Sequence, residues 1–202
     1  DLKTARRSMN LLTIEWANRG INMWTIDEGF INLVQGTATY DLPAATIDLI
    51  EQVIRTGAGS TTLQSDLNLS RISVSTYSSV PNKLTQGRPI QVWVDRLRDN
   101  PTVTVWPVPD QGTAIAPFYI LRYWRLRRIE NAGAGIETPD MNFRFFPALV
   151  SGLAYYIATK IPELMPRIEM LKSQYEEQYA LAAGEDREKA SISLVPRIYG
   201  VS

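Results

Sequence analysis

The sequence predicts an α+β protein in which both chain ends form an antiparallel helical bundle, with an inserted β-rich domain and an extended C-terminal tail. Apolar residues recur at three- and four-residue steps near both ends, which is the spacing of one helix face. The middle has short β-prone runs separated by proline and glycine turns. A hydrophobic content of 45% is enough for a core. We therefore expect a helical domain at 1–35 and 139–190, a β-rich domain at 36–138 and the tail at 191–202.

The N-terminal segment is expected to form an amphipathic helix. Asn18-Arg19-Gly20 indicates its end, because glycine suits the left-handed conformation that closes many helices. Residues 21–34 are apolar at mixed spacing, and a short helix or an extended segment would both fit them. The apolar face of the helix is predicted to contain Leu2, Ala5, Met9, Leu12 and Trp16.

Two further helices are expected between Pro139 and Ala190, separated by a turn at Pro162 to Pro166. Helices joined in this way form an antiparallel hairpin, and its apolar face needs a third element to cover it. We expect the N-terminal helix to be that element. The predicted buried faces are Phe146, Leu149, Val150, Leu153, Ala154 and Ile157 in the first helix, and Ile168, Leu171, Tyr175, Tyr179 and Ala182 in the second.

The clearest β signal is a hairpin in which Trp93 and Trp106 are among the alternating large residues. Asp99-Asn100-Pro101 supplies its turn. Residues 70–79 fit either a strand or a short helix, and glycine-rich 131–135 is typical of a linker. Further strands are expected at 37–43, 47–55 and 118–126.

Composition excludes several classes of function. The chain has 21 basic and 21 acidic residues, so no net charge favours nucleic acid or a membrane surface. It has no cysteine and no histidine, which rules out disulfides, thiolate or imidazole metal ligands and histidine-dependent triads. The carboxylate pairs Asp27-Glu28 and Glu185-Asp186 are adjacent in sequence and do not converge on one point. We expect no catalytic site, no metal, no cofactor and no membrane span.

The most basic stretch, residues 119–128, contains Arg122, Arg125, Arg127 and Arg128. On a strand, period two places Arg122 with Trp124 on one face and Arg125 with Tyr123 on the other. These arginines could contact DNA phosphates or a second subunit, with aromatic rings available for stacking. Alternatively, they belong to an edge strand and pair with acidic residues. The split across two faces favours the second interpretation.

The final segment, residues 191–202, is too short to fold alone and is expected to lie on a partner. The candidate partner-binding residues are Leu194, Pro196, Arg197, Ile198 and Tyr199.

Seven short phrases follow one another along nearly the whole chain: IEWANRG, TYDLP, GRPIQVWVDR, TVWPVPD, FFPALVSGLAYYIATK, YEEQYALAAGEDREKAS and LVPRIYG. In this order they resemble the head-to-tail adaptor proteins of tailed bacteriophages, especially short-tailed ones, which are also called tail tubular or gatekeeper-ring proteins. The resemblance implies a structural virion protein without enzymatic activity, combining a helical bundle with a β-rich domain and an extended terminus.

The same resemblance implies a ring of about twelve copies beneath the portal protein. A tail nozzle or tail tube protein would bind the far side, and viral DNA would pass through the channel without sequence recognition. The protein would be assembled in the host cytoplasm and reside at the head–tail junction of the virion. The tail from residue 191 would dock on the portal or a neighbouring copy. The competing hypothesis is an autonomous nucleic-acid-binding module that uses residues 119–128.

Overall fold

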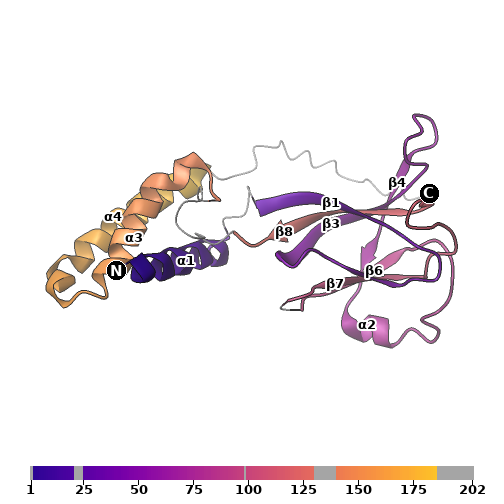
Figure 1. The fold of residues 1–202 in the computed structure, drawn as a ribbon, viewed down its shortest axis with the longest axis horizontal. Helices are drawn as coiled ribbons and strands as arrows, with labels where there is room; N and C mark the ends of the chain where they lie inside the picture. The colour runs from indigo at the N-terminus through magenta and orange to yellow at the C-terminus, as the bar shows by residue number, and fades with distance from the viewer. Residues whose placement is uncertain (1, 21–24, 98, 130–139, 186–202) are drawn as a thin grey trace, which may run out of the picture. The chain divides into compact units, whose positions relative to one another are not determined.

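The computed structural model of this chain describes residues 2–20, 25–97, 99–129 and 140–185. It divides into two compact units (Figure 1). The helical unit takes Asp1–Met23 and Asn131–Ser202 from the two chain ends, and the β unit is Trp24–Glu130. The N-terminal helix packs with the C-terminal helices, and two β-sheets are inserted between them in the sequence. The predicted fold class is therefore confirmed.

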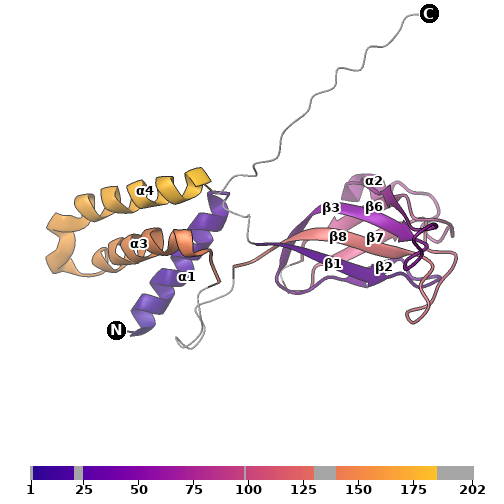
Figure 2. The ribbon, with the colours of Figure 1, turned by 90° about the horizontal axis from the view of Figure 1, so that it is seen from above.

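Among the residues that the structure describes, the helical unit has three long helices. Figure 2 shows α3 and α4 side by side as a hairpin, with α1 crossing them. The hairpin turn is a 3₁₀ helix at Pro162–Arg167, so the prolines interrupt the helices where the sequence predicted. Gly20 follows α1 with a φ of 85°, as the predicted C-terminal cap requires. The helices are α1 at Leu2–Asn18, α3 at Phe146–Ala158 and α4 at Ile168–Glu185.

Over its described ranges, the β unit forms two four-stranded sheets. The first has the antiparallel order β1-β8-β3-β4, and the second has the order β2-β7-β6-β5, in which β5 is parallel to β6. The strands of the first sheet are β1 at Ile26–Asn32, β8 at Ile120–Arg127, β3 at Thr46–Thr56 and β4 at Ser65–Asn68. Those of the second are β2 at Thr39–Asp41, β7 at Thr102–Trp106, β6 at Gln91–Asp95 and β5 at Ser70–Arg71, with the short helix α2 at Val74–Ser78.

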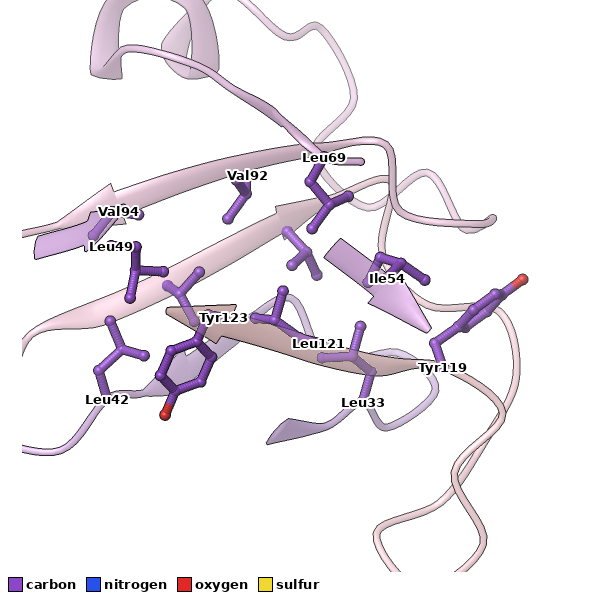
Figure 3. Packing of buried hydrophobic residues seen from close by; sticks show 12 residues of the cluster. Leu33, Leu42, Leu49, Ile54, Leu69, Val92, Val94, Tyr119, Leu121 and Tyr123 are labelled. Atoms are coloured by element: carbon purple, nitrogen blue, oxygen red, sulfur yellow. The ribbon is translucent and has the colours of Figure 1, made fainter. Parts of the chain in front are cut away.

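The core of the β unit lies between the two sheets. Figure 3 shows Val92 and Val94 of one sheet facing Leu121 and Tyr123 of the other. These side chains are at most 7% exposed, and burial of this kind stabilises a sandwich by about 25 cal/mol per Å² of apolar surface. The rest of the cluster is Leu33, Leu42, Leu49, Ile54, Leu69, Val103, Val105 and Tyr119.

The predicted tryptophan hairpin is confirmed as β6 and β7. Val92 pairs with Val105 and Val94 with Val103, and all four are buried. Trp93 and Trp106 take the alternate, partly exposed positions. The strand and helix left open at residues 70–79 both form, as β5 and α2.

Three local features add to or correct the expectations. Residues 26–32 form β1, the extended one of the two alternatives left open, and they group with the β unit because they pair antiparallel with β8. Strand β8 is an interior strand, paired on both sides, and not an edge. Strand β4 was not anticipated, because its Ser-Asp-Leu-Asn sequence is too polar to indicate a strand. The predicted linker at 131–135 lies outside the described residues.

Candidate interaction surfaces

The partner-binding residues predicted in the tail, Leu194, Pro196, Arg197, Ile198 and Tyr199, lie outside the described residues. The other predicted contacts are the arginines of β8 and the loop after it, and the structure places all of these.

Three of the four arginines are engaged within the first sheet. Arg122 forms an ion pair with Glu28 on one face. On the opposite face, Arg125 contacts Asp27 at 3.2 Å and donates a 3.0 Å hydrogen bond to Thr46, while Arg127 contacts the same Asp27 at 3.1 Å. The sequence therefore predicted both the split across faces and the acidic partners, although not the interior position of the strand.

This arrangement does not present a basic groove. The side chains of Arg122, Arg125 and Arg127 are only 26%, 15% and 17% exposed. Arg128 is the exposed member of the four, and its backbone N–H donates to the carbonyl of Ala45. A phosphate backbone needs several accessible cations in a row, so these residues form a poor DNA-binding surface.

The helical unit is held together at a close approach centred on Gly152 of α3. A Cβ atom at this position would lie 2.9 Å from side-chain atoms of both Leu12 and Tyr175. Gly152 and Ala148 are buried, so α1, α3 and α4 meet where α3 has its smallest side chains. The buried face of α4 is the predicted one, with Tyr175, Tyr179 and Ala182 each at most 9% exposed.

A polar network beside this contact connects the three helices. Glu15 accepts hydrogen bonds from the hydroxyls of Tyr156 at 2.6 Å and Tyr175 at 3.1 Å. Burial and the bond to Glu15 raise the pKa of Tyr156 to about 12, and burial also raises the pKa of Tyr175. Arg19 contacts Glu15 at 2.5 Å and donates two 2.8 Å hydrogen bonds to Glu176. These groups satisfy one another, as expected of a structural network.

The buried face of α3 was predicted incorrectly. Leu149 is buried, but Phe146 is 39% and Val150 68% exposed, and neighbouring Phe143 is 71% exposed. Phe146 and Val150 lie on the side of α3 opposite Gly152, and Phe143 precedes them in a 3₁₀ turn at Phe143–Phe145. Between Phe145 and Ala158 the sequence has no charged residue. The outer face of α3, defined by Phe143, Phe146, Val150 and Ala154, is thus an exposed apolar surface on a helix that is apolar all round.

Periodicity alone could not find this surface, because an evenly apolar helix gives no preferred face. The available signal was the total absence of charge, which indicates that a helix is covered on every side in its final assembly. In the parts of the chain that the structure describes, no helix is long and apolar enough for a membrane span. No group of three acidic residues that could hold a metal ion is found among those same residues.

Comparison with known families gives one match. Residues 2–197 match the family described as SU10 adaptor protein. No curated protein matches the chain significantly.

Proposed function

Because the chain belongs to the SU10 adaptor protein family and is a phage head-to-tail adaptor, we propose that it forms a ring joining the portal protein to the tail. The ring would contain about twelve copies, with a tail nozzle or tail tube protein on its far side. It would be assembled in the host cytoplasm and reside at the head–tail junction of the virion. The family is one of structural adaptors and not of enzymes.

The observation that carries the proposal is the outer face of α3. Phe143, Phe146 and Val150 together expose on the order of 300 Å² of apolar surface, the size of patch that on soluble proteins is often an interaction site. A subunit of a larger assembly is expected to have such a helix, which is uncharged and covered on one side only, because neighbouring subunits cover the other side. A closed ring needs such heterologous contacts between copies.

The proposal also includes the contacts predicted for the C-terminal tail and for viral DNA. The segment containing Leu194, Pro196, Arg197, Ile198 and Tyr199 would dock on the portal or on the next copy. Viral DNA would pass through the channel without sequence recognition. The zero net charge and the engagement of Arg122, Arg125 and Arg127 with acidic residues support a conduit that does not hold DNA.

The proposal is tested by mixing the full chain with the purified portal of the same phage and measuring the mass of the product by light scattering. We expect a large symmetric complex in electron micrographs, and we expect Val150→Glu to weaken or abolish it. Thr61→Glu adds the same charge at an exposed loop of the β unit and is the matched control. A wild-type chain that remains a monomer beside the portal would contradict the proposal.

A further inference from the structure

Helix α1 exposes a stripe with a basic and an apolar part, which we name the α1 stripe: Arg7, Leu11 and Ile14. Leu11 is 50% and Ile14 54% exposed, and Arg7 is also exposed. Steps of four and three residues put them on one side of the helix, opposite buried Leu12 and Trp16. The first half of α1 has no acidic residue within the helix, so its surface is positively charged.

Helix α4 exposes a complementary stripe, the α4 stripe: Met170, Glu177 and Leu181. Met170 is 52% and Leu181 64% exposed, and Glu177 is exposed between them. The three lie opposite buried Tyr175, at steps of seven and four residues. Glu169 adds a second carboxylate and Lys172 one ammonium group to the exposed surface of this helix.

The two stripes face in different directions. Helices α1 and α4 meet through Trp16 and Tyr175, whose side chains are hydrogen-bonded at 3.0 Å. Each stripe lies on the side of its helix away from that contact. One copy therefore cannot pair its own stripes, but it can offer one to the copy before it and the other to the copy after it.

We propose that the α1 stripe of one copy packs on the α4 stripe of the next, with Arg7 opposite Glu177. This inference rests on the proposed ring and assigns a pair of surfaces to its contacts between copies. It is a heterologous contact, which can repeat around a ring. The basic surface of α1 and the acidic surface of α4 provide the electrostatic complementarity that fixes partner and register.

The spacing of the apolar residues fits this pairing in either helix direction. When Arg7 lies opposite Glu177 in a parallel arrangement, Leu11 lies opposite Leu181, because each is four residues further on. In an antiparallel arrangement, Ile14 lies opposite Met170, because each is seven residues away, about 10 Å along the helix. An ion pair with an adjacent apolar pair therefore forms in both cases.

The absence of native cysteine allows a direct test by disulfide crosslinking. The double variant Arg7→Cys with Glu177→Cys is assembled on the portal, oxidised and run on a non-reducing gel. We expect a ladder of covalent multimers. A mixture of the two single variants should give dimers of the chain, and each single variant alone should stay monomeric.

Charge reversal gives an independent readout. Arg7→Glu and Glu177→Arg should each raise the concentration needed for ring assembly by about tenfold, because like charges then meet at every contact. The double reversal should restore assembly, and so should a mixture of the two single variants, since each contact then pairs opposite charges. Rescue in the mixture requires that the residues meet between copies.

The outcomes separate this inference from the proposed function. If the wild type forms a ring but the double-cysteine variant gives no crosslinks, or only a crosslink within one chain, the α1–α4 pairing is overturned and the proposed ring is unaffected. The Arg7→Cys variant can also be labelled with maleimide. If the portal protects this cysteine but neighbouring copies do not, the α1–α4 pairing is overturned and the α1 stripe is assigned to the portal. Failure of the wild-type chain to form any ring would instead contradict the proposed function.

Discussion

The indole Nε1 of Trp16 donates a 3.0 Å hydrogen bond to the hydroxyl of Tyr175, 159 positions further along the chain. Trp16 is fully buried and Tyr175 is 1% exposed. Phe145 lies against Trp16 with ring centroids 5.4 Å apart, so the beginning of the chain is fixed to both helices of the hairpin. This contact explains how segments from the two chain ends form one unit.

Tyr175→Phe tests the contribution of the Tyr175 hydroxyl, which accepts from Trp16 and donates to Glu15. The variant leaves the buried indole N–H of Trp16 without its acceptor, and we expect the free energy of unfolding to fall by about 1 to 2 kcal/mol. Urea unfolding followed by circular dichroism at the helical band measures it. Tyr155→Phe is the control, since the hydroxyl of Tyr155 makes no hydrogen bond with the described residues. An equal loss in both variants would show that the bond is not responsible.

Gly152→Ala tests the close approach of the three helices. The added methyl group would lie 2.9 Å from Leu12 and Tyr175, so we expect a loss of about 1 to 3 kcal/mol despite the better helix propensity of alanine. Gly184→Ala in α4 meets nothing within 4 Å and should instead gain up to about 1 kcal/mol. Thermal unfolding of both variants distinguishes packing from propensity. A stabilised Gly152→Ala protein would show that the helices are not closely packed.

Stability is expected to fall at alkaline pH because of the tyrosine network. The pKa of Tyr156 is raised from its ordinary value of 10.0 to about 12 by burial and by its bond to Glu15. The folded chain therefore holds this proton more tightly than the unfolded chain. The resulting stability is fully present below pH 10 and is lost as the pH rises from about 10 through 12. Unfolding measured across this range should show a shallower pH dependence in Tyr156→Phe, and an unchanged slope would refute the assignment.

The arginines of β8 are expected to stabilise the sheet and not to bind DNA. Arg125→Met removes one of the two arginines that contact Asp27, together with the hydrogen bond to Thr46, and we expect the β unit to lose about 1 kcal/mol. Arg128→Met, at an exposed position, should change stability little. Gel-shift titrations with short duplex DNA should show neither steep salt dependence nor an effect of either substitution. Tight binding by the wild type that Arg128→Met weakens would support the nucleic-acid-binding hypothesis.

The sequence predicted those elements whose polar and apolar residues are clearly separated. Helix α1 ends where Gly20 indicated, and α4 buries Tyr175 and Tyr179 as expected, because charged residues mark its outer side. Strands β6 and β7 carry valines at every second position on either side of their turn and were found for the same reason. The placement of Arg122 and Arg125 on opposite faces of the sheet was predicted from the two-residue period of a strand alone.

Elements that depend on distant partners could not be predicted. Strand β1 has its conformation because Gly29 and Phe30 pair with Tyr123 and Arg122, which follow more than ninety positions later. The buried side of α3 is chosen by the small Gly152, which admits Leu12, and not by hydrophobicity. The partner-binding residues of the tail remain predictions, as do the portal, the tail protein and the number of copies.

The central claim, that this chain is a structural ring subunit, is tested most directly by imaging the wild-type protein bound to its portal by electron cryomicroscopy. We expect a closed ring in which the outer face of α3, with Phe146 and Val150, is covered by protein. A single copy bound without neighbours, or a ring that leaves this face in solvent, would contradict the account.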